Sequence, residues 1–158
     1  MGKETERKFL VRNRSFEKDA KQIITIAQGY LCNQQDKNVR IRIAGEKAFI
    51  TIKGKTTGFS RPEFEYPVPV DEAREIIDLF CDAIIRKKRY LVHYENHIWE
   101  VDVFDGENEG LVLAEIELPD ENTSFKKPDW LGEEVTGNPE YYNAMLIKKP
   151  YKYWNKKG

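Results

Sequence analysis

Apolar and polar residues alternate along most of the chain up to residue 118, with the period of two that is typical of a β-strand with one buried face. This pattern predicts eight strands. They cover residues 3–11, 23–31, 39–44, 48–53, 61–68, 83–93, 97–104 and 111–118. Gly45-Glu46 and Glu95-Asn96 are predicted to form tight turns, and the spacing around Gly45 is that of a hairpin.

Three segments depart from the alternation and predict helices. Residues 71–80 place their apolar side chains on one helical stripe, and Asp71 is positioned to cap this helix. A short polar helix is expected over residues 15–21. A last helix is expected over residues 139–148, with Asn138 as its cap and a proline at its first position.

Eight strands with one helix inserted between them predict a mainly β fold of the α+β class, an eight-stranded antiparallel closed barrel with helices outside. A chain of 158 residues is long enough to bury a core and short enough for a single domain over residues 1–158. The sequence shows no internal repeat, low-complexity tract or linker.

Overall charge gives no reason to expect nucleic acid or a membrane as partner. Lys plus Arg number 26 against 27 Asp plus Glu, and no apolar run approaches the length of a membrane-spanning helix. Cys32 and Cys81 have neither a CxxC partner nor zinc-like spacing, so they are expected to be ordinary thiols of a reduced, cytoplasmic protein.

The charged residues follow the strand alternation, so that several strands have one charged and one apolar face. Glu4, Glu6 and Lys8 form a row of this kind, with neighbours about 6 to 7 Å apart along the strand. The basic positions of such faces are Lys8, Arg40, Arg42, Lys53, Arg61, Lys87 and Arg89. The acidic positions are Glu4, Glu6, Glu63, Glu65, Glu100, Asp102, Glu115 and Glu117.

Two interpretations fit these charged faces. The first is a sheet whose polar face is in water. The second is the charged interior of a tunnel, which we favour because like-charged neighbours repel and each same-signed pair needs an opposite partner. Converging Arg and Lys suit a polyanion with several phosphate groups. Carboxylates without His or Cys suit Mg²⁺ or Mn²⁺, so together the two sets predict a metal–phosphate substrate and phosphoryl or nucleotidyl transfer.

These residues form a series of short motifs, ExExK, RxR, a single Lys, RxExE, KxR, ExD and ExE, spread over the chain from Glu4 to Glu117. In this order they resemble the CYTH superfamily, the triphosphate tunnel metalloenzymes. The tail, with WLG at 130–132, EVT at 134–136 and YYN at 141–143, is similar to that of short bacterial members. The resemblance implies an eight-stranded tunnel that binds a triphosphate together with Mg²⁺ or Mn²⁺.

The resemblance also implies roles for single residues. Metal ligands would be Glu4, Glu6, Glu115, Glu117, Glu100 and Asp102, with Glu4, Glu6 and Glu117 as the main ones. Phosphate-binding residues would be Lys8, Arg40, Arg42, Lys53, Arg61, Lys87 and Arg89. Glu63 and Glu65, with Glu100 and Asp102, would hold a second metal or orient the attacking water. Lys87 would stabilise the leaving group, Tyr30 would touch the substrate or its leaving phosphate, and residues 141–148 would close one tunnel mouth as a lid.

The first functional hypothesis is a metal-dependent hydrolase of inorganic tripolyphosphate. Class IV adenylate cyclase and thiamine triphosphatase are alternatives that use the same tunnel. A non-catalytic polyphosphate-binding module is a further alternative, and the full set of acidic positions argues against it. The expected partner is a small triphosphate-containing molecule, and a homodimer is possible.

Overall fold

The structure is a computed structural model that describes residues 5–34, 36–55, 57, 62–120 and 122–154. The chain divides into two compact units. Unit 1 comprises residues 1–24 and 88–158, and unit 2 comprises residues 25–87. The expectation of a single domain over residues 1–158 stays a prediction.

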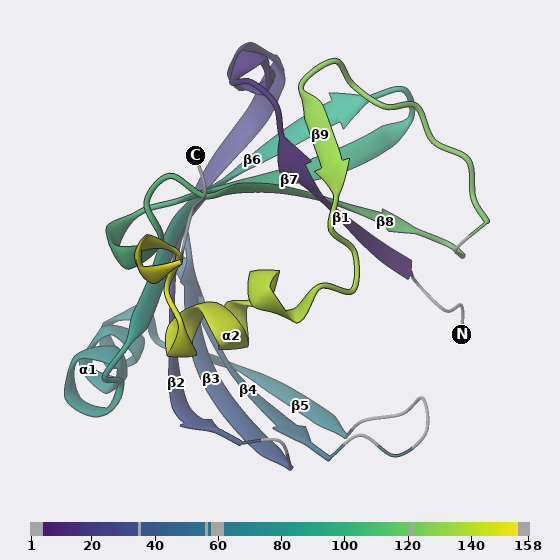
Figure 1. Cartoon of the computed structure of the whole chain (residues 1–158). Helices are drawn as coiled ribbons and strands as arrows, with labels where there is room; N and C mark the ends of the chain where they lie inside the picture. The colour runs from purple at the N-terminus through teal and green to yellow at the C-terminus, as the bar shows by residue number, and fades with distance from the viewer. Residues whose placement is uncertain (1–4, 35, 56, 58–61, 121, 155–158) are drawn as a thin grey trace. The chain divides into compact units, whose positions relative to one another are not determined.

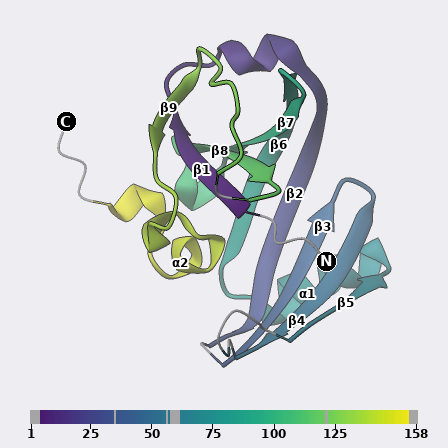
Figure 2. The same ribbon diagram turned by 90° about the vertical axis from the view of Figure 1, so that its right-hand side faces the viewer.

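Strands dominate both units, and the expected α+β, mainly antiparallel fold class is confirmed (Figures 1 and 2). The strands are β1 Thr5–Val11, β2 Ala20–Asn33, β3 Lys37–Ala44, β4 Lys47–Gly54, β5 Glu63–Val68, β6 Ile84–Tyr94, β7 His97–Phe104, β8 Val112–Leu118 and β9 Leu131–Glu134. The helices are α1 Val70–Phe80 and α2 Asn143–Lys148, with short 3-10 turns at Ser15–Asp19, Gly106–Asn108, Pro139–Tyr141 and Tyr151–Tyr153. Neither α-helix has the length and apolarity needed to cross a bilayer.

Backbone pairing joins nine strands in the order β5-β4-β3-β2-β6-β7-β8-β1-β9. The sequence predicted eight strands in a closed barrel, whereas this order has two ends, so the sheet formed by the described residues is open. The physical reason lies in unit 1, where β1 pairs with β8 along one edge and with β9 along the other (Figure 1). A strand has two edges, and both edges of β1 are therefore occupied.

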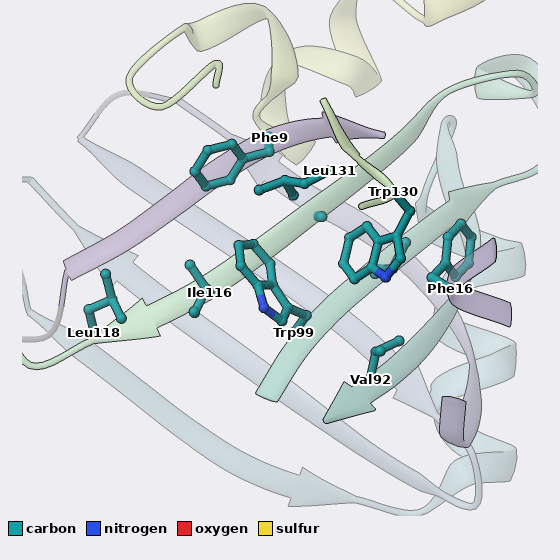
Figure 3. Close-up of a cluster of buried hydrophobic side chains, with 10 residues drawn as sticks. Phe9, Phe16, Val92, Trp99, Ile116, Leu118, Trp130 and Leu131 are labelled. Carbon is teal, nitrogen blue, oxygen red and sulfur yellow. The ribbon is translucent and has the colours of Figure 1, made fainter. Parts of the chain in front are cut away.

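The core of unit 1 is a cluster of aromatic rings on the apolar face of the sheet (Figure 3). Phe9 of β1 meets Trp99 of β7 edge to face, with ring centroids 5.6 Å apart. The ring centroid of Trp130, which precedes β9, lies 5.7 Å from that of Trp99 and 5.8 Å from that of Phe16. Such edge-to-face pairs add to the stabilisation from burial. Because strand side chains alternate, this cluster leaves the opposite face of β1, β7 and β8 to polar residues.

The core of unit 2 lies between α1 and strands β3 and β4. Ile41 and Ile43 of β3 pack with Ala48 of β4 against Ala73 and Ile77, which form the buried stripe of the helix. The predicted helix over residues 71–80 is thus confirmed within one residue. Its expected cap is wrong, because Pro69 is the N-cap residue of α1 and makes no side-chain capping bond.

The predicted helix over residues 139–148 is broken in the structure. A 3-10 turn, Pro139–Tyr141, comes first, and its cap is Asn138 as predicted, with the side-chain oxygen accepting from the Glu140 N–H at 3.2 Å. Tyr142 then adopts an extended backbone, φ −75° and ψ 140°, before α2 begins. The break separates residues 135–142, which run beside β1, from the helix proper. That α2 acts as a lid stays a prediction.

Gly29 in β2 gives a test of packing in unit 2. A Cβ at this position would stand 2.7 Å from Sγ and 2.9 Å from Cβ of the buried Cys81. We therefore expect Gly29→Ala to lower the free energy of unfolding by about 1 to 3 kcal/mol, the usual cost of overpacking, measured by urea denaturation. In the background of Cys81→Ala, which removes the nearer contact, Gly29→Ala should lower the free energy of unfolding by less. Equal stability of Gly29→Ala and the wild type would contradict the packing described.

Candidate active site

A polar face in unit 1 carries most of the predicted acidic residues. Glu6 of β1 lies opposite Glu117 of β8, and Lys8 lies opposite Glu115. Glu115 also lies opposite Glu100 of β7. Residues that face one another across antiparallel strands share one side of the sheet, so these five side chains stand together on the face opposite the aromatic core. The structure thus brings together what the alternation predicted for β1, β7 and β8.

The carboxyl groups of Glu6 and Glu115 share a hydrogen bond. This bond, burial, and the charges of Glu115 and Glu117 raise the pKa of Glu6 from its ordinary value of 4.5 to about 7, although the nearby Lys8 ammonium opposes the shift. A carboxyl group whose pKa is raised by neighbouring carboxylates marks a place where negative charge is in excess. A divalent cation would compensate the same charge with oxygen ligands, which are the ligands that Mg²⁺ and Mn²⁺ prefer.

Arg89 of β6 neutralises a second pair of carboxylates on this face. Its Nε and Nη2 donate to the two carboxylate oxygens of Asp102 at 2.8 and 3.0 Å, and Nη1 donates to Glu100 at 3.2 Å. Burial lowers the pKa of Arg89, and the bonds and charges of Asp102 and Glu100 raise it by more, so the guanidinium remains charged. Because Asp102 is only 3% exposed, this bidentate pair is a fixed part of the site.

Unit 2 carries a basic face on β2, β3 and β4. Arg40 and Arg42 of β3 lie opposite Tyr30 and Gln28 of β2, on the face away from α1. The Nε of Arg42 donates to Oε1 of Gln28 at 2.9 Å, and Nε2 of Gln28 donates to the hydroxyl of Tyr30 at 3.1 Å. Gln28 is fully buried and links two predicted site residues. Sequence reasoning missed it, although its place two residues before Tyr30 on the same strand face was visible.

The acidic residues of unit 2 are held by neighbours on the same face. Lys53 pairs with Glu63 across β4 and β5 at 3.4 Å, and Thr51 donates its hydroxyl to Glu65 at 2.9 Å. The Nε of Arg40, by contrast, is buried and finds no hydrogen-bond partner among the described residues. Buried polar groups are nearly always paired, so this N–H is suited to an anionic ligand.

Lys87 and two further predicted residues complete the comparison. Lys87 is 2% exposed, an unusual degree of burial for a lysine, and shares its strand face with Arg89. Glu4 and Arg61 lie outside the described residues. Among the residues that are described, no group of three or more His, Cys, Asp or Glu is arranged to hold a metal ion. The oxygen donors of unit 1 nonetheless fit a hard cation by their chemistry, with Glu4 as the further ligand that the sequence predicted.

Comparison with known proteins identifies the family. The family model described as the CYTH domain matches residues 2–151. The chain belongs to the CYTH family. A protein of Acetivibrio thermocellus named inorganic triphosphatase is 53% identical to this CYTH chain over 153 residues, which are 96% of this chain and 97% of that protein. A protein of Nitrosomonas europaea with the same name is 33% identical over 147 residues, 90% of this chain and 95% of its own.

A solved structure agrees with the fold of this CYTH protein. The crystal structure of an inorganic triphosphatase matches it with a TM-score of 0.75 at 31% sequence identity, over 93% of this chain and 95% of the other. The predicted membership of the CYTH superfamily is therefore confirmed by sequence and by structure. The tunnel that the family name implies concerns both units together and stays a prediction for this chain.

The raised pKa of Glu6 predicts how stability depends on pH without metal. Between pH 4.5 and about 7 the folded protein holds a proton on Glu6 that the unfolded chain has released, so this residue lowers the free energy of unfolding as pH rises through that range. The advantage of Glu6→Gln over the wild type should grow from pH 4.5 to 7 and then level off, measured by urea denaturation in EDTA. Glu109→Gln, at an exposed turn position, is the control. A constant difference between Glu6→Gln and wild type would count against the shared proton.

Proposed function

We propose that this CYTH protein is a divalent-metal-dependent hydrolase of inorganic triphosphate. The observation that carries the proposal is the group of Glu6, Glu115 and Glu117 beside the Lys8 ammonium, because it offers hard oxygen ligands for a cation next to a donor for phosphate. The names of the two relatives, both inorganic triphosphatases, support the same substrate.

Glu6, Glu115 and Glu117 would hold Mg²⁺ or Mn²⁺ together with Glu4. When bound, such a cation would neutralise charge on the phosphate oxygens and thereby favour attack at phosphorus. The proton between Glu6 and Glu115 would leave on binding, since metal ligands must be deprotonated.

The basic face of unit 2 would bind the phosphate oxygens. Arg40 offers a buried Nε without a partner among the described residues, and Arg42 is held in place by Gln28. Lys53 and Arg61 would add positive charge on this face, and Lys8 would bind phosphate beside the metal ligands of unit 1. Guanidinium groups suit this task because they donate two parallel hydrogen bonds to a phosphate.

The reaction would be attack of water on a terminal phosphorus. A new P–O bond forms, the anhydride P–O bond breaks, and the products are diphosphate and orthophosphate. Glu65, oriented by Thr51, or its neighbour Glu63 would accept the proton of the water. Lys87 would donate a proton to the leaving oxygen or stabilise its negative charge, and Tyr30 would lie beside the departing phosphate.

For Arg89, Asp102 and Glu100 the ion pairs support a more specific role. Arg89 binds both carboxylate oxygens of Asp102, so the pair is suited to keep these charged side chains in fixed positions and to orient water. We therefore place these residues beside the metal ligands. The cytoplasmic location and a possible homodimer stay predictions.

Phosphate release tests the function directly. The wild-type protein should release phosphate from tripolyphosphate with Mg²⁺ or Mn²⁺ and should be inactive in EDTA. Glu117→Gln should lower kcat/KM by about 100-fold or more, because it removes a charged metal ligand, whereas Glu109→Gln should keep wild-type activity.

The same assay distinguishes the alternatives when ATP and thiamine triphosphate are included. Cyclic AMP and diphosphate appearing from ATP, without phosphate release from tripolyphosphate, would replace the proposal by an adenylate cyclase. Preference for thiamine triphosphate would change the substrate but keep the chemistry. Tight tripolyphosphate binding without turnover of any substrate would indicate a binding module.

A further inference from the structure

Lys8 is enclosed by a segment that is distant in sequence. Residues 135–142, which we name the clamp segment, follow β9 and run beside β1 in unit 1. The Lys8 N–H donates to Oγ1 of Thr136 at 2.9 Å, and the Lys8 carbonyl accepts from the Val135 N–H at 2.8 Å. Both backbone groups of Lys8 on this edge of β1 are therefore bound by the beginning of the clamp segment.

The end of the clamp segment holds the side chain of the same residue. The Lys8 ammonium donates to the carbonyl oxygen of Tyr141 at 3.3 Å and stands 5.2 Å from the centre of the Tyr142 ring. On its other side it pairs with Glu115 at 3.1 Å. An ammonium over an aromatic face is attracted by the ring's electrons, so Tyr142 favours this position of Lys8 without using one of its N–H donors.

The backbone between these two groups of contacts makes the return possible. The Asn138 N–H donates to the Val135 carbonyl at 3.0 Å and closes a turn. Gly137 in that turn has φ +79°, a conformation that glycine adopts without the strain a side chain would cause. The turn directs the chain back so that Tyr141 and Tyr142 reach Lys8.

An ammonium has three N–H donors, and the described contacts of Lys8 use two of them, one to Glu115 and one to Tyr141. Lys8 also lines a pocket of about 330 Å³, together with Glu6, Thr136, Gly137 and Tyr142. A phosphate group in this pocket would meet an ammonium group whose position is already held by Glu115, Tyr141 and Tyr142, next to the proposed metal ligands.

We propose that the clamp segment is part of the phosphate-binding site, and that Tyr142 is a positioning residue that fixes Lys8 for a phosphate oxygen. The inference rests on the proposed function, in which Lys8 binds substrate. In this inference the aromatic ring of Tyr142 positions Lys8, and the hydroxyl group of Tyr142 has no role. Tyr142 is 44% exposed, so its replacement should leave the core of unit 1 intact.

Binding of tripolyphosphate in EDTA, measured by isothermal titration calorimetry, tests this without turnover. Tyr142→Leu should weaken binding about two- to five-fold, the effect expected for one exposed cation–π contact. Tyr142→Phe keeps the ring and should bind as the wild type does. Tyr153→Leu is a matched control, because Tyr153 is an exposed tyrosine whose ring also lies 4.9 Å from a lysine ammonium, that of Lys152.

Two further readouts separate positioning from a general structural effect. With metal present, Tyr142→Leu should raise KM for tripolyphosphate with little change in kcat. In the background of Lys8→Met, the change at Tyr142 should have no further effect on binding. Thermal unfolding of each variant checks the fold, and Tyr142→Met replaces Tyr142→Leu if the latter does not fold.

The outcomes that overturn the inference are distinct from those that overturn the function. Wild-type hydrolysis with unchanged binding by Tyr142→Leu would remove the role of Tyr142 alone. Equal losses in Tyr142→Phe and Tyr142→Leu would assign the effect to the hydroxyl and contradict a role for the ring. Absence of both binding and hydrolysis in the wild type would remove the proposed function, and the inference with it.

Discussion

Repulsion between carboxylates on one face of the sheet is the constraint around which unit 1 is arranged. Glu6 stands opposite Glu117 and Glu100 opposite Glu115, so acidic side chains meet across three adjacent strands. Such pairs are unfavourable unless a proton, a cation or a basic side chain lies between them. At Glu6 this repulsion raises the pKa of the carboxyl group, and the same concentration of negative charge makes the face suited to a metal ion.

Basic side chains reduce the same repulsion in fixed places, and each does so differently. Arg89 binds both oxygens of Asp102 and is itself held by them. Lys8 contacts Glu115 through one donor and is directed by residues 135–142. In unit 2 the situation at Arg40 is the reverse, because its buried Nε is a positively charged donor without an acceptor among the described residues. The carboxylates of unit 1 are thus suited to a cation, and the Nε of Arg40 is suited to an anion.

Much of this could be predicted from the sequence because a strand has only two faces. Alternation alone placed Glu115 and Glu117 on one side of β8 and Ile116 on the other, and both expected turns are present, with Gly45, Glu95 and Asn96 at positive φ. The same alternation, with one helix between the strands, predicted the fold class, and the family resemblance agreed with it. The strand pairing itself, which sets Lys8 beside Glu115, is a property of three dimensions that no local pattern contains.

The parts that could not be predicted depend on contacts between distant segments. Strand β9 has four residues and no alternation of its own, and it forms because the free edge of β1 offers hydrogen-bond partners. The position of Tyr142 was also not predictable, because its ring contacts the ammonium of Lys8, which lies 134 positions earlier in the sequence. The burial of Gln28 also depends on another strand. Its side-chain oxygen accepts from Arg42 of β3, and its side-chain nitrogen donates to Tyr30, so both polar ends of the buried amide are satisfied.

The different surroundings of the two cysteines have a practical consequence. Cys81 packs against Gly29, and burial, followed by the charge of Asp82, raises the pKa of its thiol, so little of it is in the reactive thiolate form. Cys32 is only half-buried and follows Tyr30 on the same strand. A maleimide dye or spin label would therefore attach to the folded wild-type chain at Cys32 first. Cys32 is thus a native labelling site for spectroscopy on a strand of the basic face.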